Sequence, residues 1–464
     1  MQVQEPAPGG PHDGLYGGAR TLAMLAVALS VLLSVIDYAI ANVALPTIAH
    51  DIHASPSSSI WVINAYQLAS VISILPLAAV GDRIGYARMC RIGLALFVLA
   101  SLLCAASTTL LELSLARALQ GFGGACIMSV NAALLRFIYP HRIIGRGIAL
   151  NGLVIAAGVA LGPTIAAGVL SVANWPWLFL INLPLGGVAL LFAITSLPRT
   201  PTRDTRFDGR SAVLNALAFG SLIVSFDRLA HGDGPIGSVA LLGFGTICLV
   251  ALVRRQLGRP DPLLPIDLLL LGGFRAAVLT GFLGFVASNF FIISMPFTLE
   301  DVLGRTAVQT GLLITPWPLA IVVVAPFIGR LSDRAPAAVI STIGLLMVAT
   351  GFCALWLMPA RPSDLDIAWR IGLAGAGFGV FQPPNNRAML VAAPVERAGS
   401  ASGMISVARL LGQTVGAMLV AMTFALLGSS ANRACLALAS ATALCAAGIS
   451  ASRLRTSRTT VAVQ

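Results

Sequence analysis

Residues 22–45 read LAMLAVALSVLLSVIDYAIANVAL, an apolar run with one charged side chain, Asp37. A transmembrane helix needs about 20 consecutive, mostly apolar residues. The run therefore predicts a membrane span. It is longer than the apolar core of a secretory signal peptide, which has about 7–15 residues, and no clear cleavage site follows it. We therefore expect this segment to remain in the mature protein as its first span.

The composition of the whole chain also indicates an integral membrane protein. Of its 464 residues, 57% are hydrophobic and only 10% are charged, and the mean hydropathy is +0.89. A soluble globular protein carries about 25% charged residues, so this chain has too few to cover a water-facing surface. All 29 basic residues are Arg. The absence of Lys excludes Schiff-base chemistry and an ATP-driven pump that carries its own G-x-x-x-x-G-K-[ST] phosphate loop.

Apolar runs of span length follow one another along the chain, and we count about fourteen of them. They begin near Leu22, Ser58, Met89, Leu110, Ile144, Trp177, Ser211, Ile236, Ala276, Gly311, Ala337, Ala368, Ser400 and Asn432. Arg and Lys collect in the cytoplasmic loops of membrane proteins. With the N-terminus inside, 22 of the 29 Arg residues fall in cytoplasmic segments, five fall outside, and Arg117 and Arg409 fall within spans. This distribution predicts that both termini are cytoplasmic, and the net charge of +11 then reflects topology rather than nucleic-acid binding.

Two short sequence features recur at nearly the same offset. The segment GDR at 81–83 recurs as SDR at 332–334, and the G-x-x-x-G pattern at 158–162 recurs at 412–416. Pairs of six-helix bundles built from internal repeats are a recurrent transporter architecture. Chance recurrence of Gly and of short loops containing Arg is the alternative. The repeat predicts six spans in each of two copies, with two further spans between them.

The predicted organisation is an all-α integral membrane fold of about fourteen helices, in two six-helix bundles plus two extra helices. We expect a cytoplasmic tail at 1–20, an N-terminal bundle at 21–197, a cytoplasmic linker at 198–210, two additional transmembrane helices at 211–254, a second linker at 255–274, a C-terminal bundle at 275–451 and a cytoplasmic tail at 452–464.

The charged residues inside spans are the first candidates for function. An ionised acid such as Asp37 is costly within the membrane, and burial favours its protonated form. Such a group can hold a proton or a cationic substrate, which is enough to couple two fluxes. Arg117 is permanently charged and needs a carboxylate, carbonyl groups or water nearby. The alternatives are a polar packing contact for Asp37 and a structural anchor for Arg117.

Two further segments have compositions typical of regions that take part in a conformational change. Asp82, Arg83, Gly85 and Arg88 place a turn and charges at a cytoplasmic helix junction, where they can latch one arrangement of the two bundles. An ordinary positively charged loop is the alternative. Within 158–163, Gly158 and Gly162 permit close approach of helix backbones, and Pro163 bends or loosens the helix.

Other polar residues give weaker predictions. Asn42, Gln120, Arg409 and Gln413 are candidates for lining a substrate cavity, while Glu300 and Asp301 either bind cations or face water. His50 and His53 resemble a metal site only by spacing, and we expect no metal. GAGFG at 375–379 resembles a nucleotide-binding loop only superficially, because it opens no βαβ unit. No Ser/His/Asp or Cys/His arrangement has a plausible scaffold in the membrane. We therefore expect neither a cofactor nor an enzyme.

Five segments resemble motifs of one protein family when they are taken together and in order. They are DYAIANVALP at 37–46, GDRIG at 81–85, LARALQG at 115–121, GVALGP at 158–163 and NWPWLFLINLPLG at 174–186. They are similar to motifs of the major facilitator superfamily, specifically its fourteen-span drug/proton antiporters. YA at 86–87 replaces the basic pair of the loop motif, and Arg88 keeps one charge. The resemblance implies a major-facilitator-type fold and proton-driven efflux by alternating access, with Asp37 and Arg117 handling the proton.

The resulting functional hypothesis is a proton-coupled exporter of hydrophobic or amphipathic drugs or toxic compounds in a bacterial cytoplasmic (inner) membrane. Its expected partners are a small-molecule substrate, protons and the lipid bilayer; accessory envelope proteins are left open. The thirteenth span carries Arg409 but no acid, so the charge of the substrate stays open as well. An exporter of a metabolite or siderophore, a symporter on the same fold and, more distantly, a non-transporting membrane sensor are the alternatives.

Overall fold

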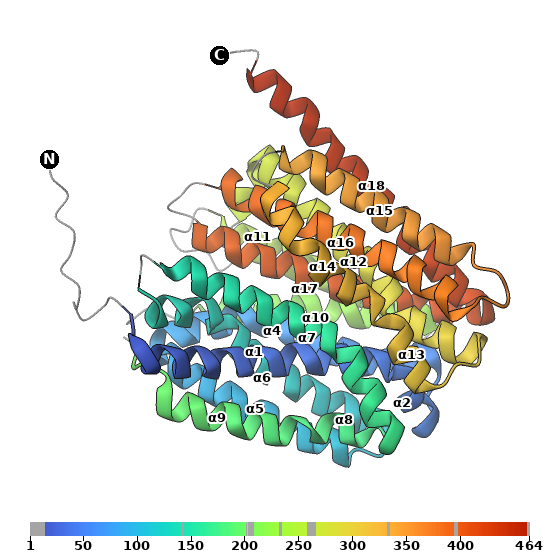
Figure 1. The fold of residues 1–464 in the computed structure, drawn as a ribbon, viewed down its shortest axis with the longest axis horizontal. Helices are drawn as coiled ribbons and strands as arrows, with labels where there is room; N and C mark the ends of the chain where they lie inside the picture. Colours follow the sequence, from blue (N-terminus) through green and yellow to red (C-terminus); the bar gives the residue numbers. More distant parts are fainter. Residues whose placement is uncertain are drawn as a thin grey trace, which may run out of the picture.

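The computed structural model describes residues 14–140, 143–200, 202, 208–231, 234–257, 266–331, 335–393 and 398–461. Over these residues the chain is helical and contains no strand (Figure 1). The α-helices are α1 (Gly17–Val43), α2 (Leu45–Asp51), α3 (Pro56–Ser59), α4 (Trp61–Ile84), α5 (Tyr86–Ala106), α6 (Leu110–Ile138), α7 (Ile144–Val172), α8 (Pro176–Leu180), α9 (Asn182–Ser196), α10 (Gly209–His231), α11 (Pro235–Gln256), α12 (Gly272–Phe297), α13 (Ala307–Ile314), α14 (Pro316–Leu331), α15 (Ala337–Trp356), α16 (Asp364–Ala392), α17 (Ala398–Leu427) and α18 (Ala431–Val461). The shorter elements are the 3-10 helices η2 (Ile266–Leu270) and η5 (Gly428–Ser430) and the π-helical turn η3 (Thr298–Val302).

The described residues include eleven helical stretches that are long and apolar enough to cross a membrane, or twelve when α4 and the short helix before it count as one bent span. Pro76 bends that span by 54°, because proline cannot donate the backbone hydrogen bond of a regular helix. One apolar stretch, Gly403–Leu454, covers most of both α17 and α18. Helix α16 is not among these stretches; its first turn is acidic and it contains QPPNNR at 382–387.

The helices form two groups that lie side by side. In Figure 1 the blue-to-green helices α1, α5 and α9 lie below the orange-to-red helices α15, α16 and α18. We call α1 to α9 the first group and α12 to α18 the second. In the first group, α5 and α6 approach so closely that a Cβ on Gly93 would lie 2.9 Å from the carbonyl oxygen of Gly123. The same contact recurs in the second group, where a Cβ on Gly344 would lie 2.7 Å from the carbonyl oxygen of Gly377. Gly93 and Gly344 are 251 residues apart, and Gly123 and Gly377 are 254 residues apart. The repeated sequence segments have the same two offsets, so the packing contact recurs with the sequence repeat.

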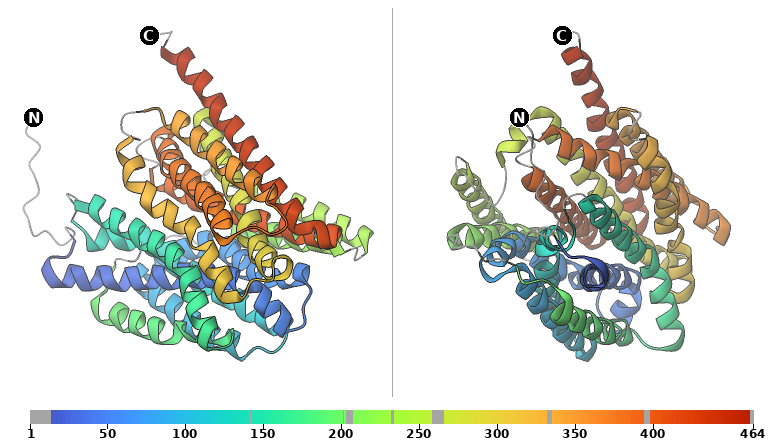
Figure 2. Two further views of the ribbon diagram at one scale, coloured as in Figure 1. Left: turned by 45° about the vertical axis from the view of Figure 1, so that its right-hand side comes forward. Right: turned by 60° about the vertical axis from the view of Figure 1, so that its left-hand side comes forward.

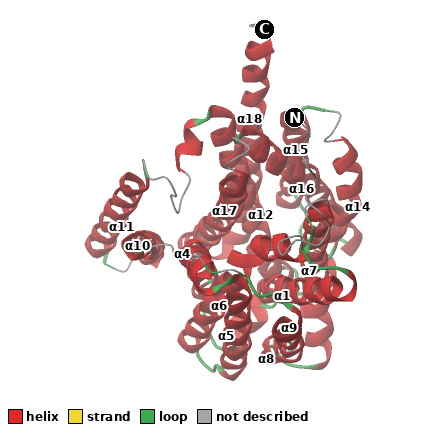
Figure 3. Ribbon diagram, turned by 90° about the vertical axis from the view of Figure 1, so that its left-hand side faces the viewer, coloured by secondary structure: helices red, strands yellow, loops and turns green. Residues whose placement is uncertain are grey.

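Helices α10 and α11 lie outside both groups, beside α4 (Figure 3). Helix α10 packs against α4 of the first group and α17 of the second. The Asn215 side-chain amide donates to the carbonyl oxygen of Ile72 at 2.9 Å, which fixes α10 on α4. Arg255 pairs with Asp208 at 3.1 Å and so closes one end of the α10–α11 hairpin. The additional pair therefore lies against the seam between the two groups.

The two groups are joined by hydrogen bonds toward the α2 end of the helices. Thr47 and Glu300 are hydrogen-bonded at 3.3 Å, and Thr164 and Thr315 at 3.2 Å. Figure 2 shows the same arrangement from two further directions, with the blue-to-green helices below the orange-to-red ones. These hydrogen bonds therefore join the two groups at the end of the molecule that carries α2.

Some of the sequence predictions fall outside the described residues. Segment 332–334, which carries the second copy of the loop motif, is not described, and neither are 201 and 203–207 of the first predicted linker or 258–265 of the second. Helix α18 continues to Val461, so the residues expected to form a tail from 452 begin as helix.

Candidate functional site

The centre of the candidate site is an ion pair between α1 and α6. Arg117 Nη1 donates to Asp37 Oδ2 at 2.5 Å, and the two side chains are 0% and 1% exposed. The sequence predicted both residues separately but did not identify the acid that Arg117 meets. The structure brings them together, so each charge compensates the other inside the protein.

Neutral polar side chains complete the coordination of the Asp37 carboxylate. Its Oδ1 accepts from Gln120 Nε2 at 2.8 Å and from Asn182 Nδ2 at 2.7 Å. Ser101 Oγ accepts from the same two amide groups, at 2.8 and 3.3 Å. The carboxylate is therefore held by three donors from two helices, α6 and α9, and all five side chains are buried. Gln120, expected in a substrate cavity, belongs instead to this cluster.

Arg117 is fixed by contacts on several sides. Its Nε donates to the carbonyl oxygen of Val62 at 3.0 Å, and its Nη1 also donates to Gln120 Oε1 at 2.5 Å. The guanidinium carbon lies 4.5 Å from the centre of the Tyr66 ring, a distance that allows a cation–π interaction. Its Nη2 is buried and has no hydrogen-bond partner among the described residues. Removing the charge of Asp37 would therefore leave a buried cation with only neutral partners.

The sequence did not single out Ser101, Asn182 or Tyr66. Each is an uncharged residue in an apolar span, and such residues are common in membrane helices. Only Asn182 lay within a quoted motif, at 174–186. Their role as partners of the ion pair depends on how α4, α5 and α9 pack against α1 and α6.

A second polar cluster joins the two helix groups. Tyr38 Oη donates to Asn289 Oδ1 of α12 at 3.0 Å and accepts from Gln67 Nε2 of α4 at 3.3 Å. Asn289 in turn donates to the carbonyl oxygen of Gln413 in α17. Tyr38 and Asn289 are 251 residues apart, so equivalent positions of the repeat meet where the groups touch. Asn42 donates to the carbonyl oxygen of Tyr38 within α1.

Arg409 lies in α17, one helical turn before Gln413. It is partly exposed. No carboxylate pairs with it in the described part of the chain. Of the predicted cavity residues, Asn42 contacts Tyr38 directly and Gln413 is linked to it through Asn289, while Arg409 lies one helical turn from Gln413.

The predicted antiporter motif packs α7 against the segment of α1 that carries Asp37. A Cβ on Gly158 would lie 2.9 Å from Val35 Cγ1, and a Cβ on Gly162 would lie 2.3 Å from Ala39 Cβ. The carbonyl oxygen of Pro163 faces Gly311 of the second group. The glycines therefore allow α7 to lie against α1 on one side of the ion pair.

Substitution of Gly162 by Leu is expected to lower the free energy of unfolding by about 1–3 kcal/mol, because the new side chain needs space that Ala39 occupies. Thermal unfolding in detergent measures the effect. Gly168→Leu is the matched control, because Gly168 lies on the same helix with nothing within 4 Å of an added Cβ. Equal losses in the two variants would contradict tight packing at Gly162.

The predicted latch residues lie at the turn between α4 and α5. Gly85 occupies this turn with φ of +93°, a conformation that favours glycine. Tyr86 Oη donates to Asp82 Oδ1 at 2.5 Å. Arg83 and Arg88 are exposed, and neither pairs with a carboxylate in the part of the chain that is described. The structure thus brings Asp82, Gly85 and Tyr86 together but leaves the two Arg side chains apart from them.

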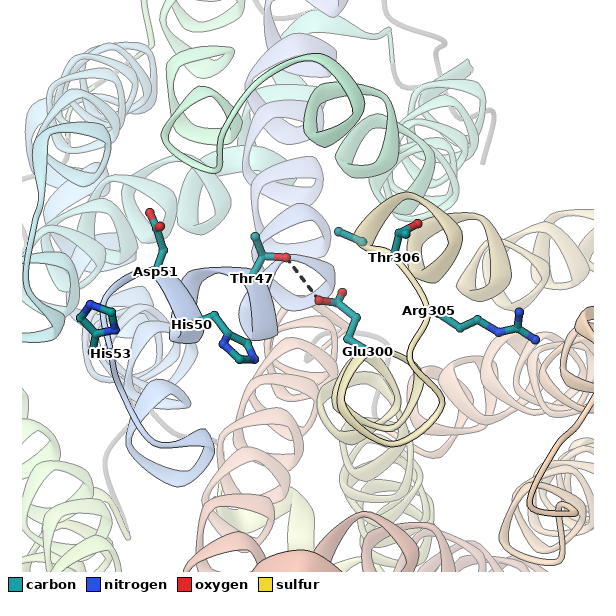
Figure 4. Close-up of a pocket in the computed structure, with 8 residues that line it drawn as sticks. Thr47, His50, Asp51, His53, Glu300, Arg305 and Thr306 are labelled. Carbon is teal, nitrogen blue, oxygen red and sulfur yellow. Dashed lines mark hydrogen bonds between the residues drawn. The ribbon is translucent and has the colours of Figure 1, made fainter.

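A pocket of about 570 Å³ lies between the groups at the α2 end. Figure 4 shows Thr47 and Glu300 facing each other across it and Arg305 pointing away. Glu300 Oε2 accepts from Thr47, whereas Oε1 is buried with no partner among the described residues. His50 Nε2 lies 3.6 Å from Asp301 Oδ1. No group of three or more potential metal ligands occurs in the ranges that the structure describes.

An all-helical, membrane-spanning fold with ionisable groups buried between its helices is that of a polytopic transport protein. The chain belongs to the Major Facilitator Superfamily, whose family model matches residues 27–417. This is a family of transporters, not of enzymes.

Comparisons with individual proteins agree with this assignment. The chain is 48% identical over 444 residues to the uncharacterized transporter YebQ of Escherichia coli (strain K12), covering 95% of this chain and 97% of YebQ. It is 29% identical over 415 residues to the multidrug resistance protein Stp of Mycobacterium tuberculosis (strain H37Rv), covering 88% of this chain and 75% of Stp. The crystal structure of a POT family transporter in complex with 5-aminolevulinic acid shares the fold, with a TM-score of 0.73 at 15% identity over 95% of this chain and 97% of that one.

Proposed function

We propose that this protein is a proton-coupled secondary exporter of hydrophobic or amphipathic compounds. The observation that carries the proposal is the buried ion pair of Asp37 and Arg117, since ionisable groups inside a membrane protein are functional by default. Similarity to a multidrug resistance protein supports export as the direction of transport and drug-like compounds as the substrates.

The proton step in this proposal takes place at Asp37. When a proton neutralises the carboxylate, Arg117 loses its counter-ion, and the donors Gln120 and Asn182 lose a charged acceptor. The buried cation is then costly, so the helices that hold it tend to rearrange or to admit water. Inward movement of one elementary charge supplies about 2.3 kcal/mol per 100 mV of membrane potential.

Alternating access in this proposal is a rocking of the two helix groups. The positive-inside distribution of Arg supports an orientation with the α2 end outside the cell and both termini in the cytoplasm. The hydrogen bonds at Thr47–Glu300 and Thr164–Thr315 then close the outer side. Asp82, Arg83, Gly85 and Arg88 lie at the opposite end, where we assign them to a latch that forms when the cytoplasmic side closes.

For the membrane arrangement we propose fourteen spans in a bacterial cytoplasmic membrane. The eleven apolar stretches become fourteen when Gly403–Leu454 is divided into α17 and α18 and when α4 and α16 are added. The two groups then correspond to six-span bundles at 21–197 and 275–451, with α10 and α11 as the additional pair.

Everted membrane vesicles with an acidic interior test the proposal. Amphipathic compounds added outside are expected to release protons from vesicles that contain the wild-type protein but not from vesicles with Asp37→Asn. Asp51→Asn is the control, because it makes the same chemical change at an exposed residue. Equal proton release by wild type and Asp37→Asn would exclude Asp37 as the coupling group. If no compound in a broad panel releases protons, the antiport proposal fails.

A further inference from the structure

Arg409, on α17, carries a positive charge that no carboxylate pairs with in the described part of the chain. Asp37 and Arg117 neutralise each other at 2.5 Å. Arg409 lies one helical turn before Gln413, whose carbonyl oxygen accepts from Asn289, the partner of Tyr38. It lies eleven residues into α17, about 16 Å from the start of the helix at 1.5 Å per residue. An unpaired guanidinium at this depth is costly in the absence of an anion.

The polar residues on α1 and α4 near Tyr38 also offer unused hydrogen-bonding atoms. The side-chain oxygens of Asn42, Asn64 and Gln67 are buried and have no partner in the described part of the chain. Tyr38 connects this region to the second group through Asn289. Buried polar atoms in native structures are normally satisfied, so these atoms are available to hydrogen-bond a polar ligand or water.

Apolar side chains lie next to the same region. Gly412, one turn beyond Arg409, is packed so closely on α12 that an added Cβ would lie 2.8 Å from Phe285 Cβ. The part of α17 next to Arg409 is therefore packed against apolar residues of α12. Small-molecule sites combine apolar walls with a few oriented polar groups.

We infer that Arg409 binds the anionic group of an amphipathic substrate, such as an aromatic carboxylate. The guanidinium supplies the charge and two parallel donors that match a carboxylate. Tyr38 and Gln67 from the first group, and Asn289 and Gln413 from the second, place the site where both groups contact the ligand. This inference rests on the proposed transport function and names its substrate class. Because the Asp37–Arg117 pair is already neutral, the anion does not compete with the proton for one charge, and exchange depends on the conformational change.

Three probes that share a naphthalene ring test the inference on the purified full-length protein in detergent, by isothermal titration calorimetry. They are naphthalene-2-carboxylate, the neutral 2-naphthylmethanol and the cationic 2-naphthylmethylammonium. The carboxylate is expected to bind tightest. Arg409→Gln is expected to raise its Kd about tenfold or more, which corresponds to about 1.4 kcal/mol or more, and to leave the Kd of the alcohol within about twofold. Arg409→Lys keeps the charge and is expected to bind the carboxylate more tightly than Arg409→Gln does.

Arg433→Gln is the matched control, because it removes the same charge from an exposed residue. Retained binding of the alcohol shows that a variant is folded. The inference is overturned if the ammonium probe binds tightest, if Arg409→Gln leaves the Kd of the carboxylate unchanged, or if the carboxylate does not bind at millimolar concentration. Carboxylate binding that depends on Arg409, without proton release in vesicles, would instead overturn only the antiport proposal.

Discussion

Replacement of Arg117 by Gln is expected to lower the free energy of unfolding by about 3–5 kcal/mol and to abolish proton exchange. The substitution leaves the Asp37 carboxylate fully buried without its cation, and Gln120 and Asn182 cannot replace that charge. It also removes the donor to the Val62 carbonyl oxygen and the cation that stacks on Tyr66. Titration with SDS in mixed micelles measures the loss of stability.

The double variant Asp37→Asn/Arg117→Gln separates charge from packing. With both charges removed, no ion is left buried, so the double variant is expected to be more stable than Arg117→Gln alone while still lacking proton exchange. Arg117→Lys keeps the charge but lacks the guanidinium geometry that reaches both Asp37 and Val62, so an intermediate loss is expected. A double variant that is no more stable than Arg117→Gln would show that the ion pair does not determine stability here.

The charged part of this site was predictable from sequence because charge is rare inside membrane spans. Asp37 and Arg117 are each unusual in their own span, and either could be found without knowledge of the other. Their pairing was not predictable, because they are 80 residues apart and meet only through the packing of α1 on α6. The additional donor Asn182 was missed because a single Asn in an apolar helix is not distinctive.

The same reasoning explains which features of the fold could be predicted. The helical membrane-protein class follows from the length of the apolar runs, and the recurring glycine contacts of α5–α6 and α15–α16 agree with the sequence repeat. The position of α10 was not predictable, since it depends on packing against both α4 and α17 and on the Asn215 amide, which donates to a backbone carbonyl of α4. Gln120 was assigned to a cavity because sequence gives a polar residue no direction, and the helix turns it toward Asp37.

Replacement of Gly311 by Val is expected to prevent the two groups from meeting at the α2 end and to abolish transport. Gly311 lies in α13 of the second group, and an added Cβ would lie 2.6 Å from the carbonyl oxygen of Pro163 and 2.8 Å from Ala167 Cβ, both in α7 of the first. A backbone oxygen cannot move aside as a flexible side chain can, so the added atoms must separate the groups. Every 1.4 kcal/mol of strain changes the ratio of the two conformations about tenfold.

Hydrogen–deuterium exchange of α2 and α13 measures this separation, and proton release in everted vesicles measures the loss of transport. Faster exchange is expected in Gly311→Val, because parting the groups removes the cover that Thr47–Glu300 and Thr164–Thr315 provide. Gly403→Val is the matched control, since nothing lies within 4 Å of an added Cβ there. Unchanged exchange together with lost transport would mean that Gly311 acts on another step. Normal transport by Gly311→Val would mean that the contact in this conformation is not needed during the cycle.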